Sequence, residues 1–257
     1  MSVFAQLYKS LYSPKDMARF RFQKIGKTIL YILLLSLLTT IPESIQTGKL
    51  MKEQFSLLSQ TVETDIPDFQ IKDGKLLSDI KEPIIKEEVD FTFVFDPNTT
   101  EIPASLKNED GIFLLQDKAI AVASGRADTY SYASFSEFTI SKQDIRDFLD
   151  FMQSIYPVAL FVIGLFLFLF NSFISFLGIT LLAFGGTFIS GQMNRKLNYR
   201  QLWTLTAYSF TIPTFFFTVM KFLHTAVPFP VLIFTGVTFF LLYLIIKEIP
   251  PAKQKIA

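Results

Sequence analysis

Apolar residues are concentrated toward the two ends of the chain, and polar residues fill its middle. A first uncharged run covers residues 28–42, and a second covers residues 151–194. Two further apolar runs lie at about 202–222 and 229–246. A helix needs roughly 20 apolar residues to cross a bilayer, and these runs approach or exceed that length. The pattern predicts a polytopic α-helical membrane protein with four or five hydrophobic helices, for which the lipid bilayer is the first partner.

The second run leaves the number of crossings open. It is longer than one untilted helix requires, and its simplest division is into two segments broken near Asn171–Ser172. That division gives five crossings. One long tilted helix with a re-entrant or interfacial piece gives four.

Basic residues before the first run predict its orientation. Residues 1–27 carry Lys and Arg side chains with a single acid, Asp16, and such flanks stay on the cytoplasmic side. We expect a cytoplasmic N-terminus and a first transmembrane helix at 28–43, retained as a signal anchor, in a multi-pass protein of the cell membrane. Alternatively, 28–42 lies at the interface and leaves the polar middle of the chain in the cytoplasm.

Later basic residues bear on the same question. Arg195, Lys196 and Arg200 follow the long run, and lysines recur in the polar tail at 248–257. If the polar middle is outside, four crossings place these residues inside and five place them outside. Only the first result agrees with the usual bias of Lys and Arg toward the cytoplasm.

The N-terminal segment has the spacing of a surface helix. Phe4, Leu7, Tyr8 and Leu11 recur at helical intervals beside basic residues, which predicts an amphipathic helix at the inner membrane surface. Ser13–Pro14 ends this helix and favours the start of a second short one.

Residues 44–150 have the pattern of a small water-exposed α+β domain inserted after the first helix, and we expect this domain on the extracytoplasmic side. Three Phe side chains alternate in 90–95, so they share one face of a strand. Residues 112–115 and 119–122 flank a turn as a hairpin, and Tyr130 with Tyr132 indicates a further strand. We expect a three- or four-stranded antiparallel sheet.

Helical patterns also border this domain. Leu50, Phe55 and Leu58 continue a helical stripe beyond the first run, and Ser141 with Asp144 is typical of a helix N-terminus. The domain and the bundle at 151–247 are therefore expected to be joined by continuous helices, which favours mechanical coupling.

Charge separates the same regions. Half of the chain is hydrophobic and it contains 30 Phe, and every acidic residue except Asp16 and Glu248 lies from Glu43 to Asp150. The middle domain is therefore acidic. With no cysteine, the sequence excludes disulfides, thiolate nucleophiles and Cys-ligated metals.

Catalytic patterns are weak, and we expect neither an enzyme nor a cofactor, metal or nucleic-acid site. Gly26-Lys27-Thr28 lacks the earlier glycine of a phosphate-binding loop, because position 21 is Arg. His224 is the only histidine, so two-histidine metal sites are excluded. The residue types permit a catalytic dyad of Ser190 with His224, but no nucleophile elbow surrounds any serine. The position of His224 is typical of a helix end at the membrane interface.

A carrier would need a polar path through the helices. Residues 151–247 contain no acid, which disfavours a proton-driven carrier. Candidates for a polar path are Asn171, Ser172, Ser175, Thr204, Thr206, Ser209, Thr211 and Thr214.

Tyr130, Tyr132 and Trp203 offer aromatic surfaces on which a sugar could stack, and no other residue pattern supports a sugar site.

Polar clusters in the middle domain have ordinary explanations. Glu87-Glu88-Asp90 and Glu109-Asp110 lack the spacing of a calcium loop, so a solvated acidic surface is favoured. Asn98-Thr99-Thr100 matches a glycosylation acceptor, a motif that is short enough to arise by chance.

Two stretches carry a resemblance to a known family. Residues 10–15, Ser-Leu-Tyr-Ser-Pro-Lys, lead into the first helix, and residues 195–202, Arg-Lys-Leu-Asn-Tyr-Arg-Gln-Leu, precede Ala207-Tyr208-Ser209 and Pro213. Together they resemble a Gram-positive membrane family catalogued as domain of unknown function 1189, some of whose members carry the label maltodextrose utilisation protein MalA. The later stretch is also similar to the broader Yip1-like membrane fold, in which the corresponding loop is cytoplasmic.

The resemblance implies an accessory role near an oligosaccharide uptake system, and it provides no binding residues to transfer. We therefore expect a non-enzymatic accessory or regulatory membrane protein that contacts a transporter or a sensor. The alternative is a small transport or permease component for an oligosaccharide or another solute.

Overall fold

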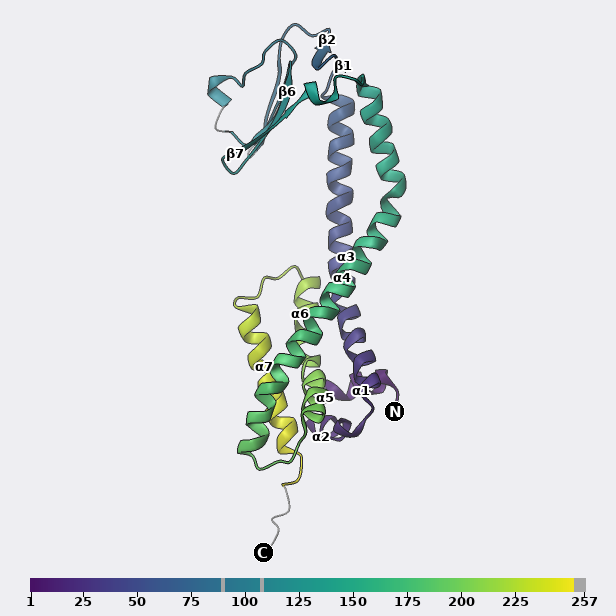
Figure 1. Cartoon of the computed structure of the whole chain (residues 1–257), viewed down its shortest axis with the longest axis vertical. Helices are drawn as coiled ribbons and strands as arrows, with labels where there is room; N and C mark the ends of the chain where they lie inside the picture. The colour runs from purple at the N-terminus through teal and green to yellow at the C-terminus, as the bar shows by residue number, and fades with distance from the viewer. Residues whose placement is uncertain (89–90, 107–108, 252–257) are drawn as a thin grey trace, which may run out of the picture. The chain divides into compact units, whose positions relative to one another are not determined.

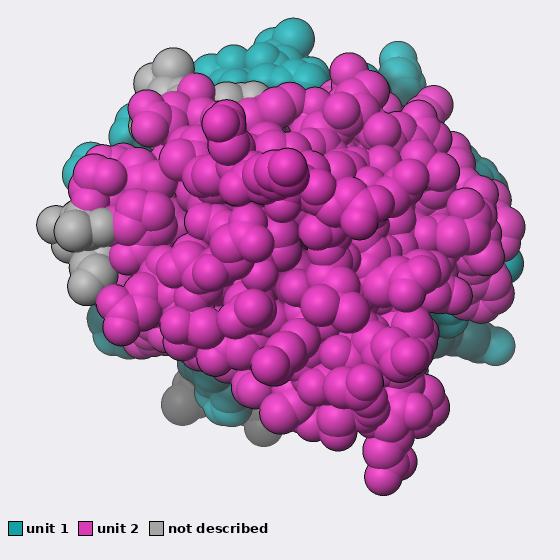
Figure 2. All heavy atoms as spheres, turned by 90° about the horizontal axis from the view of Figure 1, so that it is seen from above, with its two compact units in different colours: residues 1–49, 158–257 teal, residues 50–157 magenta. Residues whose placement is uncertain are grey.

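The computed structural model describes residues 1–88, 91–106 and 109–251, and it divides into two compact units, which Figure 2 colours separately. Unit 1 comprises Met1–Lys49 and Val158–Ala257, and unit 2 comprises Leu50–Pro157. Each unit has its own apolar core among the described residues.

Unit 1 is helical (Figure 1). Among the described residues, three helices are long and apolar enough to cross a membrane, namely α3, α4 and α7. The helical elements that lie wholly or partly in unit 1 are α1 (Val3–Ser10), α2 (Pro14–Arg19), the 3-10 turn η1 (Phe20–Phe22), α3 (Ile25–Thr64), α4 (Lys142–Gln192), α5 (Tyr199–Ser209), α6 (Thr211–Phe222) and α7 (Pro230–Lys247).

The predicted break near Asn171–Ser172 is wrong. Helix α4 runs without interruption through both residues to Gln192, and it carries its one internal proline at Pro157 instead. Asn171 does not end the helix because its amide bonds to side chains of α3 rather than to the local backbone. The long apolar run is therefore one helix.

The apolar run at 202–222 forms two short helices that meet at Phe210. Phe210 keeps a helical backbone and is both the last cap of α5 and the first of α6. Helix α5 begins with a capping box, in which Asn198 accepts from the Gln201 amide and the Gln201 side chain accepts from the Asn198 amide. The segment is thus a nearly continuous helical run.

The N-terminal helices follow the expected pattern. Ser13 caps α2 and Pro14 occupies its first position. Phe4 and Tyr8 of α1 are exposed, whereas Leu7 packs against the core of unit 1. That core joins the N-terminal segment to α3, α5 and α7, and its fully buried side chains include Met17, Tyr31, Ile32, Leu202, Leu205, Tyr208, Leu242 and Ile245.

Unit 2 contains two sheets, which corrects the expected three- or four-stranded antiparallel sheet. A three-stranded sheet has the order β2-β1-β8, and a five-stranded sheet has the order β3-β4-β5-β6-β7, in which β4 and β5 are parallel. The strands are β1 (Phe69–Lys72), β2 (Lys75–Ser78), β3 (Ile84–Glu88), β4 (Phe91–Asp96), β5 (Gly111–Leu115), β6 (Lys118–Ala123), β7 (Arg126–Ser131) and β8 (Ile140–Ser141).

The parallel pairing of β4 with β5 is the reason why the predicted all-antiparallel sheet is wrong. Strands joined by short hairpin turns are antiparallel. The connection from β4 to β5 is long enough for the chain to return and run parallel to β4. Gly111 begins β5 and pairs with Thr92, and a Cβ on Gly111 would lie 2.0 Å from the Thr92 carbonyl oxygen. Only glycine permits this approach of the two strands.

Alternation in β4 divides its side chains between two cores. Phe93 and Phe95 pack in one cluster, and Val94 packs with Phe113 in the other, on the opposite face. The expected hairpin of β5 and β6 is confirmed. Tyr130 lies in β7, but Tyr132 begins a 3-10 turn, Tyr132–Phe135. Asp90, the first residue of the predicted strand, lies outside the described residues.

The helical ends in unit 2 pack on the first cluster. Val62 of α3 and Ile145 and Leu149 of α4 contribute to it. Lys142, which is buried, donates to the backbone oxygen of Ile66 at 2.5 Å. Ser141 and Asp144 form the expected cap, because the Ser141 amide and hydroxyl both donate to the Asp144 carboxylate, at 2.7 and 2.6 Å.

Candidate functional site

A stripe of polar side chains lies on α3 within the helical unit. Ser36, Thr39, Thr40 and Glu43 recur at intervals of three or four residues, so they share one face of the helix. Both threonine hydroxyls donate to the Ser36 carbonyl oxygen at 2.8 Å. The stripe therefore satisfies part of its own hydrogen bonding and leaves the Glu43 carboxylate to partners on other helices.

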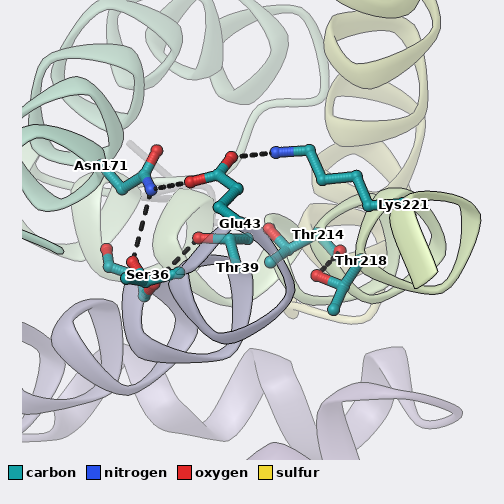
Figure 3. Close-up of polar contacts among 8 residues, drawn as sticks. Ser36, Thr39, Glu43, Asn171, Thr214, Thr218 and Lys221 are labelled. Carbon is teal, nitrogen blue, oxygen red and sulfur yellow. Dashed lines mark hydrogen bonds and ion pairs between the residues drawn. The ribbon is translucent and has the colours of Figure 1, made fainter. Parts of the chain in front are cut away.

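Glu43 joins three helices through its carboxylate (Figure 3). One oxygen accepts a hydrogen bond of 2.6 Å from the Asn171 amide on α4. The other oxygen forms an ion pair with the Lys221 ammonium on α6. The Asn171 amide also donates to Thr40 at 3.3 Å. Because removing a charge from water is costly, this pairing lowers the cost of placing Glu43 and Lys221 at an apolar bundle.

A cavity of about 500 Å³ lies beside this polar cluster. Asn171, Lys221 and Thr39 line it, together with Ser175 and Thr214. Apart from Thr235, the remaining lining residues are apolar or glycine and come from α3, α4, α6 and α7, together with Phe210 between α5 and α6. The cavity thus combines one polar margin with an apolar interior.

A second polar network lies among the N-terminal segment, α3 and α5. The Tyr208 hydroxyl donates to the Gln6 side chain at 2.9 Å and accepts from Gln23. The Gln6 amide donates to Gln23 at 2.6 Å. Tyr31 bonds Thr211 at 2.5 Å, and its ring lies 4.2 Å from that of Tyr208. These bonds satisfy buried polar groups and fasten the N-terminal helices to the bundle.

The predicted polar path is gathered only in part. Asn171, Ser175 and Thr214 line the cavity. The others face elsewhere, with Ser172 buried and its hydroxyl unpaired among the described residues. The hydroxyls of Thr204, Thr206, Ser209 and Thr211 each donate to a backbone carbonyl within or next to their own helix.

The hypothetical dyad does not form. Ser190 is buried and donates to the Thr187 carbonyl at 3.0 Å, while His224 is exposed in the loop after α6, with φ 53°. Figure 1 shows the α4–α5 and α6–α7 loops at opposite ends of unit 1. No group of three His, Cys, Asp or Glu suited to a metal ion occurs within residues 1–88, 91–106 and 109–251.

The three suggested sugar-stacking side chains are divided between the two units. Trp203 stacks on Phe176 and donates to Thr180 at 3.1 Å in unit 1. In unit 2, Tyr130 is exposed, but Tyr132 is buried. Burial, reinforced by the charge of Asp117, raises the pKa of the Tyr132 hydroxyl above its ordinary value. Tyr132 is therefore a core residue with no open face for a sugar.

The acidic surface of unit 2 is described in part. Glu87 and Glu109 are exposed, as expected of a solvated acidic surface, whereas Asp90 lies outside the described residues. Asp110 accepts a hydrogen bond of 2.9 Å from the Ser124 amide. Asn98 of the short glycosylation motif is exposed, and its amide bonds Asp96 at 2.9 Å.

Sequence reasoning missed the pairing of Glu43 with Lys221. It treated Glu43 as the boundary of the acidic domain and counted acids only in 151–247. The spacing of Ser36, Thr39 or Thr40, and Glu43 was the available signal, because a polar stripe in an apolar helix indicates a buried polar contact. The identity of the partners depends on tertiary packing.

A family model described as Protein of unknown function (DUF1189) matches residues 4–246. The chain belongs to the DUF1189 family. The match includes both units, so the polar insertion is part of the DUF1189 chain and not an appendage to it. The comparisons of this DUF1189 protein with curated proteins and with solved structures gave no match.

Proposed function

We propose that this DUF1189 protein is a non-enzymatic accessory or regulatory protein of the cell membrane, in which contact of unit 2 with a partner alters the helical bundle. The observation that carries the proposal is the form of the two chain connections. Helix α3 begins in unit 1 and ends in unit 2, and α4 begins in unit 2 and ends in unit 1. A helical connection transmits a displacement that a flexible linker would absorb.

The proposed topology has a cytoplasmic N-terminus and four crossings. Its support is that α4 is a single helix, so α3, α4, the α5–α6 run and α7 give an even number of passages. The positively charged loop with Arg195 and Lys196 then lies on the same side as the basic N-terminal segment, in agreement with the bias of Lys and Arg. Unit 2 lies on the outside.

The partner proposed for unit 2 is a transporter or sensor of maltodextrin uptake. This part rests on the family label implied by the sequence resemblance, and on the exposed aromatic side chains of unit 2. Phe138 is 65% exposed and Tyr130 is 59% exposed. Exposed aromatic side chains are enriched where proteins contact partners.

Photo-crosslinking in cells tests the partner. A benzophenone amino acid placed at Phe138 should yield an adduct containing a membrane transporter or sensor. The same group at Phe113, which is fully buried, should yield none. Absence of such an adduct from Phe138 and from Tyr130 would contradict a partner on this surface.

Coupling is tested by interrupting one connection. Three glycines inserted after Pro157 in α4 should leave crosslinking intact but lower maltodextrin uptake to the level of a deletion strain. The same insertion after Thr225, in the α6–α7 loop, serves as control. Uptake that is unaffected by deletion of the protein would reject the proposed pathway.

The second candidate function is a small transport component. The observation that favours it is the Glu43–Lys221 pair beside a cavity in the bundle, since charged groups within membrane segments often line solute paths. Reconstitution of the purified protein alone into liposomes separates the two functions. A carrier accumulates labelled maltodextrin, whereas an accessory protein does not.

A further inference from the structure

The cavity in unit 1 is elongated along α4. Its lining includes Asn171 and Leu182 of that helix, which lie about 16 Å apart at a rise of 1.5 Å per residue. Asn171 and Lys221 are at its polar margin, and Gly178 and Ile179 line its apolar part. Its volume of about 500 Å³ lies within the range of small-molecule sites, roughly 300–1,000 Å³.

The polar margin of the cavity includes one cation, the Lys221 ammonium. Both oxygens of Glu43 are engaged, one by Asn171 and one by Lys221. The Lys221 ammonium has three N–H donors. Among the described residues, its ion-pair partner is Glu43. Its side chain is 44% exposed. The free donors of Lys221 therefore favour an anionic group at this end of the cavity.

The surroundings of the cavity are apolar. On α4, Ile174, Leu177 and Leu181 are each about half exposed, in a helix long enough to cross a membrane. A bilayer would cover such a surface with hydrocarbon, so the molecule best placed to enter is a lipid chain rather than a water-borne solute.

We propose that this cavity binds one acyl chain of a bilayer phospholipid, with the lipid phosphate at the Lys221 ammonium. The chain follows α4 from Asn171 toward Leu182. Because lipid tails are as apolar as the side chains that they contact, the chain contributes fit and little net driving force. Preference for the site then comes from the charge-assisted bonds between phosphate and ammonium.

Two substitutions separate the roles of chain and headgroup. Gly178→Leu places a side chain in the cavity, and the position accepts a Cβ because the nearest atom, Cζ of Phe210, would be 3.4 Å away. Lys221→Met removes the cation, and Lys221→Arg retains it. Matched controls are Gly191→Leu, where a Cβ meets nothing within 4 Å, and Lys196→Met in the exposed α4–α5 loop.

The test is native mass spectrometry of the full chain, titrated in detergent with dioleoyl phosphatidylglycerol, with dioleoylglycerol, which lacks the phosphate, or with oleate. We expect one phosphatidylglycerol per chain, with dioleoylglycerol bound at least tenfold more weakly. Gly178→Leu and Lys221→Met should each weaken phosphatidylglycerol binding at least tenfold, while Lys221→Arg and both controls should stay within twofold.

Three results would overturn the proposal. Equal binding of dioleoylglycerol would remove the phosphate from recognition, and tighter binding of oleate would make a free fatty acid the occupant. Unchanged phosphatidylglycerol binding in both Gly178→Leu and Lys221→Met would place the lipid elsewhere. Thermal unfolding followed by the fluorescence of the single tryptophan, Trp203, verifies that each variant is folded.

Discussion

A charged residue in the bundle loses hydration, and interactions with other residues must offset that free-energy cost. Glu43 has two such partners, Asn171 and Lys221. Its ion pair with Lys221 is partly exposed, with side-chain exposures of 24% for Glu43 and 44% for Lys221. Solvent screening therefore limits the strength of the pair, and the neutral bond from Asn171 adds to it. The cluster fastens α3 to α4 and α6 at one point.

Replacing Glu43 by Gln should destabilise the chain by about 1 kcal/mol, because the ion pair is lost while the shape and the bond to Asn171 can persist. Thermal unfolding in detergent measures the effect. The exposed Glu53→Gln is the control. The exchange Glu43→Lys with Lys221→Glu should recover part of the loss, and equal loss in the single and exchanged variants would contradict a specific pair.

Tyr208→Phe tests the second polar network. The substitution removes one hydroxyl and leaves Gln6 and Gln23 without their shared partner in a buried site. An unpaired buried polar group costs about 1–3 kcal/mol, so the unfolding midpoint should fall by several degrees. Tyr243→Phe, at a position 43% exposed, should change it little. An equal fall in both variants would show that the network contributes nothing particular.

At the scale of elements, the start of α4 carries a pH-dependent contribution. Hydrogen bonds from the Ser141 side chain and backbone amide hold the pKa of Asp144 below its ordinary value of 3.8. A carboxylate whose pKa is lowered by folding stabilises the folded state when the pH is above the ordinary pKa of the group. The contribution disappears as the pH falls through the lowered pKa.

Asp144→Ala should therefore lower the unfolding midpoint at about pH 7, and the difference from the unchanged chain should shrink as the pH falls below the ordinary carboxyl pKa, about 4, and vanish below the lowered pKa of Asp144. Asp150→Ala, at an exposed position on the same helix, is the control. Midpoints measured by circular dichroism across this pH range give the comparison. A difference that persists in acid would mean that the carboxylate acts through contacts other than the cap.

Local patterns predicted the elements whose causes are local. Ser13–Pro14 and Ser141 with Asp144 determine helix starts through their own backbone bonds, and alternation gave the hairpin of β5 and β6. The parallel pairing of β4 with β5 was not predictable in this way, because it depends on where a long connection returns. The same holds for the partners of Glu43, which lie more than a hundred residues away.

For the whole molecule, the continuity of α4 has the largest consequence. A second passage within 151–194 would have reversed the sides of every later loop, and one continuous helix removes that reversal. In the proposed topology, unit 2 and the α6–α7 loop are outside, and the α4–α5 loop is inside. The absence of cysteine makes these sides measurable one position at a time.

Cysteines introduced singly at exposed positions should therefore alternate in accessibility. Asn98→Cys and Thr225→Cys should react with a membrane-impermeant maleimide in intact cells, whereas Asn198→Cys should react only after permeabilisation. The reason is that a single passage of α4 separates unit 2 from the α4–α5 loop, and the α5–α6 run returns the chain to the outer side. Reaction of Asn198→Cys in intact cells would require an even number of passages between the two sites, which a continuous α4 does not provide. Reaction of Asn98→Cys only after permeabilisation, with Asn198→Cys open from outside, would keep the four crossings but invert them, and would move the partner of unit 2 into the cytoplasm.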